Sequence, residues 1–221
     1  MVIDQTAIWG THVPSDKSGI ADPRTTPDPA KYGMTKGPSF HSDAFLFATE
    51  GPAWAVWEGY SLVAVATPKS APFALQLSFD LMVDANFVKH SHLVETDTIW
   101  CSPDGFNSNL SIQRRMDTGM MQVADQQGNW ADSGFIPPPL TPDVYHPHLF
   151  RYLIDPVRHT GGTQAMVIDG VLFIVPTRLQ GLLAEHKGWT PGALLQIQSC
   201  LNETGGTSSF MLRNIQYQVI A

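Results

Sequence analysis

The sequence predicts an all-β fold, a two-sheet antiparallel β-sandwich of the jelly-roll type, and three observations support this prediction. Hydrophobic residues make up 43% of the 221 positions, which is enough to build one large core. From Ser42 onward, short segments with strand-like alternation follow one another, with turn residues between them. Only one segment has its apolar residues at helical spacing. Many strands in one chain of this length are typical of two sheets packed around a shared core.

The individual strands are predicted from the same alternation. In Phe73–Leu81, apolar residues alternate with mixed ones, as expected for a strand with one buried face. Asp169-Gly170 separates two apolar runs and predicts a tight hairpin. Leucines recur at helical spacing between Arg178 and His186, so a short surface helix or turn is expected there. Further strand-like runs cover residues 59–66, 92–100, 109–115, 149–155, 163–169, 171–175, 193–201 and 208–220.

The domain organisation is predicted to be simple. Residues 1–40 are rich in proline and glycine without lasting periodicity, so we expect an irregular N-terminal arm packed on the core. Residues 41–221 are expected to form a single β-sandwich domain. The first 40 residues show no charged segment followed by an apolar one, so no secretory signal is predicted. This leaves a cytoplasmic protein and the mature form of a secreted one as alternatives, and the sequons at Asn109 and Asn202 keep the second open.

Charge and cysteine content exclude several classes of partner and site. Thirteen Lys and Arg against 20 Asp and Glu give a net charge of −7 without any basic run, which disfavours nucleic acid and anionic membranes as partners. No apolar stretch approaches the roughly 18 residues of a membrane span. Cys101 and Cys200 belong to no CxxC pair, which excludes a zinc site built on thiolates. They form either one disulfide or two buried free thiols.

Three predicted strands each have one polar face. Because residues two apart share a face of a strand, the polar side chains on each strand point the same way. Two interpretations are open: a groove lined by hydrogen-bonding groups, or a plain solvent face. Amides, carboxylates and one arginine recur where a solvent face would favour Lys, Glu and Thr, and this choice favours the groove. The residues concerned are Glu95 and Asp97 on the first strand, Asn109, Ser111, Gln113 and Arg115 on the second, and Gln196 and Gln198 on the third.

Four segments occur in an order that resembles the concanavalin A-like lectin and glucanase superfamily. They are Leu93-Val94-Glu95-Thr96-Asp97, Phe150-Arg151-Tyr152-Leu153-Ile154-Asp155, Met166-Val167-Ile168-Asp169-Gly170-Val171 and Phe210-Met211-Leu212-Arg213-Asn214-Ile215-Gln216-Tyr217. The resemblance covers roughly residues 73–221, and the order of the segments carries most of it. It implies a jelly roll with a concave ligand-binding sheet.

The resemblance to glucanases is incomplete at the catalytic motif. Those enzymes carry Glu-x-Asp followed by a second Glu on one strand, as nucleophile, assisting acid and acid/base. Glu95 and Asp97 match the first two positions, whereas Ile99 and Trp100 stand where the third carboxylate is expected. Retaining hydrolysis needs two carboxyl groups in separate roles. The resemblance therefore does not imply hydrolysis by the usual route.

Histidines and tryptophans are the remaining candidates for chemistry. His90-Ser91-His92 and His146-Pro147-His148 are HxH pairs, a spacing that can chelate a divalent metal. His92 and Glu95 are an odd number of residues apart and should face opposite ways on a regular strand, so no metal is predicted. His92 remains a candidate proton-transfer group near the rim of the cleft. Trp100 and Trp130 are candidate ligand platforms, with packing in the core as the alternative.

The sequence favours a non-hydrolytic, cofactor-independent enzyme of the lyase or cyclase type. Its substrate would be a small organic molecule or an oligosaccharide, held in the groove and activated by orientation, hydrogen-bond polarisation and proton transfer. Glu95 would act as base or acceptor, Asp97 would orient it, and Arg115 would stabilise developing negative charge, with His92 nearby. Asn109, Ser111, Gln113, Gln196, Gln198, Trp100 and Trp130 would bind the substrate.

Two other functions remain open. The first is a lectin-like carbohydrate-binding module that uses the same groove. The second is a glycoside hydrolase whose acid comes from another strand, such as Glu58, Asp125 or Asp132. The sequence leaves the oligomeric state open.

Overall fold

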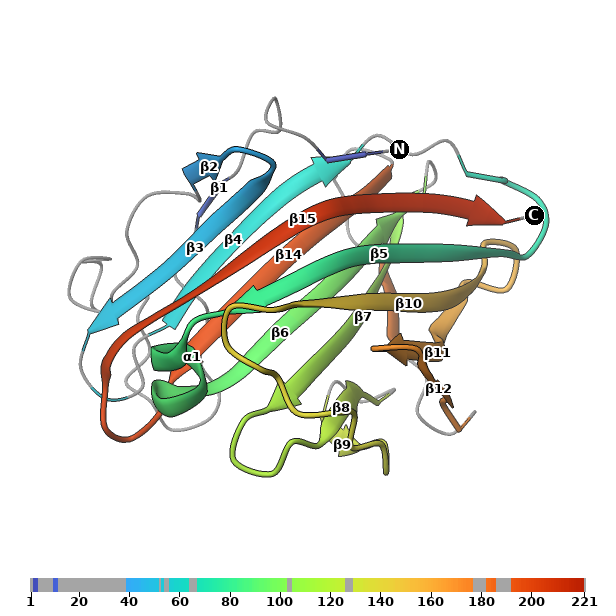
Figure 1. Ribbon diagram of the computed structural model, residues 1–221. Coiled ribbons are helices and arrows are strands. Elements are labelled where there is room, and N and C mark those ends of the chain that lie inside the picture. Colours follow the sequence, from blue (N-terminus) through green and yellow to red (C-terminus); the bar gives the residue numbers. More distant parts are fainter. Residues whose placement is uncertain are drawn as a thin grey trace.

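The computed structural model describes residues 2–3, 10–11, 39–51, 53, 56–63, 67–102, 105–125, 129–176, 182–185 and 192–220. Two antiparallel sheets lie face to face and enclose one core (Figure 1). This confirms the predicted all-β sandwich.

One sheet has seven strands and the other has eight. The seven-stranded sheet has the order β12-β11-β10-β5-β15-β3-β2, that is Val171–Ile174, Thr160–Ile168, Tyr145–Asp155, Phe73–Val83, Gly206–Ile220, Ala44–Gly51 and Ser39–His41. The eight-stranded sheet has the order β1-β4-β14-β6-β7-β8-β9, that is Gly10–Thr11, Val56–Val63, Gly192–Leu201, Ser91–Cys101, Phe106–Arg115, Met121–Ala124 and Trp130–Asp132, and β13 (Leu182–Glu185) pairs with β7. Neighbours such as β14 and β6 are far apart in sequence, so the chain crosses repeatedly between the sheets.

Alternation explains how the strands bury one face. In β5, every second residue from Phe73 to Val83 is buried against the opposite sheet, while Gln76, Ser78 and Asp80 are only partly covered. The strand β6 differs, because every residue from Val94 to Cys101 is buried on either face. Its outer face, away from the core, is therefore sheltered from solvent.

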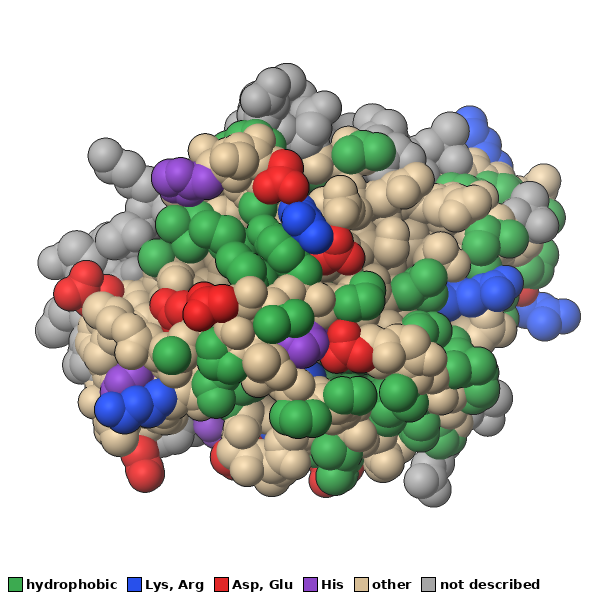
Figure 2. Space-filling model, in the orientation of Figure 1, with side chains coloured by type: hydrophobic (Ala, Val, Ile, Leu, Met, Phe, Trp, Pro, Cys, Tyr) green, Lys and Arg blue, Asp and Glu red, His purple; other side chains and the backbone are tan. Residues whose placement is uncertain are grey.

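The outer faces of the two sheets differ in chemistry. On the seven-stranded sheet, Leu153, Leu172 and Ile174 are exposed, and hydrophobic side chains gather at the right of Figure 2, over β11 and β12. The outer face of the eight-stranded sheet carries carboxylates and amides instead.

The expectation of a short helix or turn over residues 178–186 is wrong at residues 182–185. Leu182–Glu185 forms the strand β13, which pairs antiparallel with β7, and the other residues of that segment lie outside the described residues. A short apolar run does not distinguish a helix from a strand, and here the free edge of β7 decided the outcome. The one helix among the described residues is α1 (Ala85–His90), which is too short to cross a membrane.

The hairpin prediction at Asp169-Gly170 is confirmed. These two residues join β11 to β12 and have φ values of 51° and 79°. Two positive φ values in a two-residue connection are the requirement of a type I′ turn, which Asp-Gly satisfies at low cost.

Part of the N-terminal arm is described. Val2 bridges Gln216, and the Ile3 amide donates to the Ile215 carbonyl at 2.8 Å, with the Ile3 side chain buried in the core. Gly10–Thr11 pairs with β4 at the edge of the eight-stranded sheet. Residues 12–38 lie outside the described residues, so the predicted boundary at residue 40 stays a prediction.

The two cysteines are free and buried. In the strand register, Cys101 lies opposite Gly192, whereas Cys200 lies opposite Leu93, eight residues before Cys101 on β6. At about 3.3 Å per residue the two thiols are roughly 26 Å apart, far beyond the reach of a disulfide. Of the two alternatives, the structure selects the free thiols.

Candidate functional site

Glu95 and Asp97 lie on the outer face of the eight-stranded sheet. Their neighbours on β6 face the core: Val94 and Thr96 line a cavity between the sheets, and Thr98 Oγ1 lies 2.9 Å from Tyr217 Oη of the opposite sheet. Because alternate residues point to opposite faces, both carboxylates point away from the core. Their side chains are 9% and 2% exposed, so they form a recessed floor rather than an open surface.

Five polar residues cross the outer face in one line, one on each of five neighbouring strands. The Cα register pairs Gln198 with Glu95, Glu95 with Gln113, Gln113 with Gln122, and Gln122 with Asp132. We call these five residues the polar row. Neighbouring strands are about 4.8 Å apart, so the row spans roughly 19 Å, which is the length of a short linear ligand.

A second line of polar residues runs beside the polar row. Gln196, Asp97 and Ser111 are register partners, and Gln196 Nε2 donates to Asp97 Oδ2 at 2.9 Å. Ser111 Oγ donates to Asn109 Oδ1 at 2.9 Å. The structure thus brings both predicted carboxylates and all five predicted amide and hydroxyl residues onto one face.

Asp132 fixes the direction of a hydrogen-bonded amide chain within the polar row. An ionised carboxylate only accepts, so Gln122 must present its Nε2 to Asp132 Oδ1, 2.7 Å away. Its Oε1 then accepts from Gln113 Nε2 at 2.5 Å. Gln113 Oε1 is left as a buried acceptor with no hydrogen-bond partner among the described residues. Gln113 is the register partner of Glu95. The Gln113 amide oxygen and the Glu95 carboxylate are therefore neighbouring acceptors at the centre of the row.

The polar row and the line beside it are acidic, with Glu95, Asp97 and Asp132 on the outer face. Arg115 lies two register pairs beyond Glu95 and Gln113. Arg115 is committed to an ion pair, because its Nη2 lies 2.6 Å from Asp117 Oδ2 and its Nε donates to Asp117 Oδ1 at 3.1 Å.

His92 lies at the same end of the sheet as Arg115 but not with Glu95. Its backbone carbonyl accepts from the Met116 amide at 2.8 Å. Burial lowers the pKa of His92, and the Arg115 charge lowers it further while Asp117 opposes this. His92 is thus part of a cluster with Arg115 and Asp117 at the rim.

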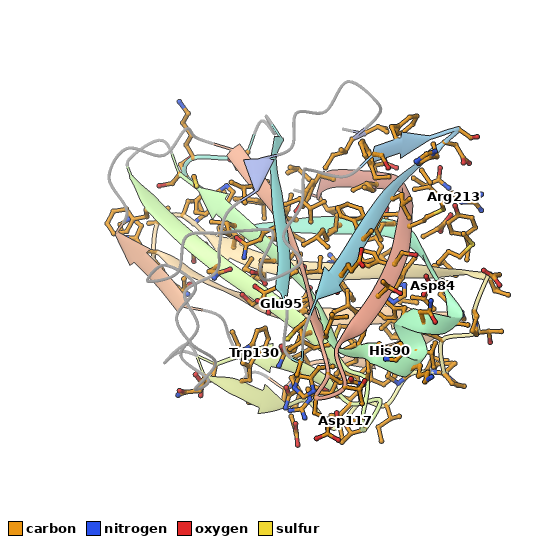
Figure 3. All side chains as sticks on the ribbon, turned by 90° about the vertical axis from the view of Figure 1, so that its left-hand side faces the viewer. Asp84, His90, Glu95, Asp117, Trp130 and Arg213 are labelled. Carbon is orange, nitrogen blue, oxygen red and sulfur yellow. The ribbon has the colours of Figure 1, made fainter. Side chains whose placement is uncertain are left out.

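The two candidate tryptophans have different surroundings. Trp100 is fully buried, its ring packs edge-on against Phe73 at 5.7 Å, and its Nε1 donates to Thr67 Oγ1 at 3.3 Å. The prediction of Trp100 as a ligand platform is therefore wrong, because its position in the alternation directs it to the core. Trp130 shares the outer face with Asp132 and is 37% exposed, below Glu95 in the view of Figure 3.

Sequence reasoning did not identify Gln122 as part of the site. The strand β8 has only four residues, so its alternation is too short to be recognised, although Met121 and Val123 are buried and Gln122 and Ala124 are not. The backbone of Glu58 continues the line of the polar row, because its Cα lies opposite that of Gln198.

Within the described ranges, no three His, Cys, Asp or Glu side chains converge in an arrangement that could hold a metal ion. The predicted independence from cofactors stays a prediction.

Comparison by sequence finds no matching protein-family model, and no curated protein matches. Several solved structures resemble the fold. A mutant alginate lyase in complex with an alginate tetrasaccharide is 13% identical, with a TM-score of 0.51, and the match covers 99% of this chain and 96% of that one.

Two further structures have lower scores. An endo-1,3-beta-glucanase from Streptomyces sioyaensis is 9% identical with a TM-score of 0.46, covering 99% of this chain and 91% of that one. A legume lectin-like domain from Entamoeba histolytica is 12% identical with a TM-score of 0.43, covering 83% and 87%. At such identities the likeness concerns the fold alone. The two antiparallel sheets of this chain share the jelly-roll fold of the alginate lyase, which agrees with the fold that the sequence resemblance implies.

Proposed function

We propose that this protein binds a neutral oligosaccharide along the polar row. The observation that carries this proposal is the buried Gln113 Oε1, an acceptor without a partner among the described residues. Leaving such an atom unsatisfied costs about 1–3 kcal/mol, so a donor is needed beside it. Sugar hydroxyls donate and accept at the same time. Two neighbouring hydroxyls of one sugar ring could each donate one hydrogen bond, the first to Gln113 Oε1 and the second to the Glu95 carboxylate.

The charge of the row supports a neutral ligand over an acidic one. Glu95, Asp97 and Asp132 would repel a polymer of uronic acids, and Arg115 is already paired with Asp117. Trp130 at the β9 end offers an exposed ring face, against which the apolar face of a sugar ring can pack. The fold neighbour that contains an alginate tetrasaccharide supports an oligosaccharide as the class of ligand.

The experiment is calorimetric titration with neutral gluco-oligosaccharides and, in parallel, an alginate tetrasaccharide. We expect the neutral ligands to bind, and Gln113→Leu and Trp130→Ala each to weaken binding about tenfold or more, which corresponds to about 1.4 kcal/mol. Gln218→Leu, which changes an exposed glutamine on the opposite sheet, should leave affinity unchanged. Equal affinity in all variants would place the ligand elsewhere.

A β-eliminating lyase is the second candidate, and the cluster of His92 and Arg115 favours it. In that reaction Glu95 would take the proton next to a substrate carboxylate, the C–O bond to the leaving sugar would break, and a C=C bond would form. The leaving oxygen would take up a proton. Arg115 would have to exchange Asp117 for that carboxylate. An unsaturated product from an acidic oligosaccharide, detected by its ultraviolet absorbance and lost in Glu95→Gln, would establish this function and overturn the neutral-ligand proposal.

Product analysis also distinguishes hydrolysis from oligosaccharide binding alone and from β-elimination. New reducing ends without an unsaturated product would indicate a hydrolase with a second carboxylate. Asp132 lies three strands from Glu95, roughly 14 Å in Cα distance, which exceeds the spacing of either hydrolytic class. The Cα of Glu58 lies only two strands away, roughly 10 Å, and Glu58→Gln is the variant to test.

A further inference from the structure

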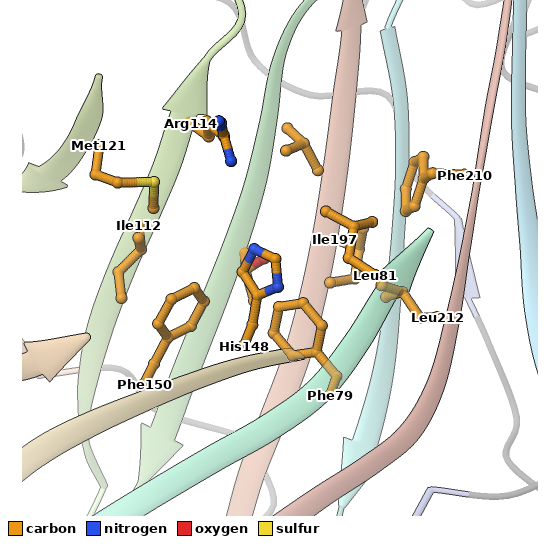
Figure 4. Close-up of a pocket in the computed structure, with 12 residues that line it drawn as sticks. Phe79, Leu81, Ile112, Arg114, Met121, His148, Phe150, Ile197, Phe210 and Leu212 are labelled. Atoms are coloured by element: carbon orange, nitrogen blue, oxygen red, sulfur yellow. The ribbon is translucent and has the colours of Figure 1, made fainter. Parts of the chain in front are cut away.

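The space between the two sheets contains a cavity of about 20 Å³, which is room for one water-sized particle. Most of its lining is apolar, with Phe79, Phe150 and Phe210 among its walls. Three side chains differ from the apolar ones: Thr96 adds a hydroxyl, and Arg114 from β7 and His148 from β10 are ionisable. The two ionisable side chains face the cavity from opposite sheets (Figure 4).

Arg114 carries a buried charge, and among the described residues no carboxylate forms an ion pair with it. Arg114 is 5% exposed. Its guanidinium donates one hydrogen bond, from Nη2 to the Pro138 carbonyl at 2.8 Å. Nε and Nη1 are buried without a hydrogen-bond partner among the described residues. A guanidinium has five N–H donors and stays protonated in proteins. A buried cation with unused donors is costly unless something compensates its charge.

The other ionisable groups around Arg114 do not supply that compensation by contact. Asp169, in the β11–β12 turn, attracts Arg114 electrostatically without an ion-pair contact. Its Oδ2 instead lies 2.7 Å from His146 Nδ1. His148 Nδ1 lies 2.7 Å from the His146 carbonyl, which can only accept, so Nδ1 carries the hydrogen. Nε2 is therefore the ring nitrogen of His148 that takes up a second proton.

We propose that this cavity is a binding site for one small monovalent anion, of the size of chloride, held by an unpartnered N–H of Arg114. The anion balances the guanidinium charge, which a water molecule cannot do, and the apolar walls exclude larger or strongly hydrated anions. His148 faces the same anion, and a bound negative charge favours the protonated ring. Anion binding therefore takes up a proton at His148, and affinity rises toward acid pH.

The test is thermal unfolding of the full chain at constant ionic strength, with chloride replacing gluconate, an anion too large for the cavity. We expect Tm to rise by about 3–6 °C once chloride exceeds its Kd roughly tenfold, and more at pH 5 than at pH 8. Arg114→Met, which fills the site without charge, should abolish the response. Arg158→Met removes an arginine whose side chain is 82% exposed and should keep it.

A second measurement covers the case in which Arg114→Met does not fold. Wild-type crystals soaked in bromide should show an anomalous peak between Arg114 and His148. A peak absent from the cavity, with density for a water molecule only, overturns the proposal. So does a chloride response of the same size in Arg114→Met and the wild type.

Discussion

Thr98 joins the two sheets through a buried hydroxyl pair. Its Oγ1 lies 2.9 Å from Tyr217 Oη, deep in the core between the two sheets. Burial raises the pKa of Tyr217 and, more strongly, that of its neighbour Tyr152. Both phenols therefore stay neutral throughout the pH range of a folded protein, and the contact is a hydrogen bond rather than an ionic one.

A double-mutant cycle measures this hydrogen bond. Thr98→Val and Tyr217→Phe should each lower the free energy of unfolding by about 1–3 kcal/mol, because each leaves a buried hydroxyl partner unsatisfied. The double variant should lose less than the sum of the two, since it removes both polar groups. Urea unfolding is the measurement, with Thr160→Val, an exposed threonine, as control. Additive losses would show that the two hydroxyls do not interact.

His148 makes the stability depend on pH. Complete burial lowers its pKa from 6.5 to about 4, so the folded protein keeps the ring neutral while the unfolded chain protonates it. Between pH 6.5 and pH 4 the unfolded state binds the extra proton, and the free energy of unfolding falls as the pH falls. The slope is about 1.4 kcal/mol per pH unit, or about 3 kcal/mol over the window.

The comparison with His148→Phe tests this sign. Urea unfolding in halide-free buffer at pH 7 and pH 4.5 should show a smaller loss for the variant than for the wild type. Phe in this position keeps the stacking on Phe79, where the ring centroids are 5.1 Å apart. His41→Gln, at an exposed position, should follow the wild type. If His148→Phe and the wild type lost stability equally, His148 would titrate normally in the folded state.

At the scale of elements, the helix α1 depends on one capping residue. Asp84 Oδ1 accepts from the Phe87 amide at 2.5 Å, and its Oδ2 accepts from Ser209 Oγ on β15 at 2.6 Å. The cap thereby ties a six-residue helix to the seven-stranded sheet and holds Phe87 in the core. A helix of this length has little stability of its own.

Asp84→Ala should therefore lower the free energy of unfolding by about 1–2 kcal/mol. Asp84→Asn keeps an accepting oxygen at the cap and should lose only a fraction of that amount. Urea midpoints of the two variants give the comparison. A loss as large in Asp84→Asn as in Asp84→Ala would assign the effect to the charge rather than to the cap.

The strands differ in how well alternation predicted them. Strands such as β5 and β14 have ten residues or more, and their predicted ranges, 73–81 and 193–201, lie within the observed strands. The strands β8 and β13 have four residues each, too few to show a period. The strand β8 was not predicted, and β13 lies where a short helix or turn was expected. Both exist because a longer neighbour, β7, offers hydrogen-bonding partners on that edge.

At the scale of the whole molecule, both thiols are shielded from reagents. Cys101 is buried and the pKa of its thiol is raised to about 11, while Cys200 Sγ donates to the Leu201 carbonyl at 3.2 Å. A thiol reacts as its thiolate, so neither should react quickly in the native state. We expect an aromatic disulfide reagent to label almost nothing in native protein and both cysteines in denaturant. Denatured protein with no reactive thiol would indicate a disulfide and contradict the register.

The candidate site was partly readable from the sequence. Strand parity placed Glu95, Asp97, Gln113 and Gln198 on faces of their own strands, but parity does not say which strands are neighbours. The register did so by setting β14, β6, β7, β8 and β9 side by side, which makes a row of residues from positions 95 to 198. Trp100 was misassigned for the same reason that Glu95 was placed well, because parity at position 100 is that of the core.

The sequence by itself determined the fold class, the polar and apolar faces of the long strands and the Asp169-Gly170 turn, because these depend on residues close together in the chain. Only the tertiary structure decided the order of the strands, the separation of the two cysteines and the burial of Arg114 beside His148. Those features depend on contacts between distant segments. Local alternation sets the face on which a side chain lies, but packing of the whole chain sets what it meets there.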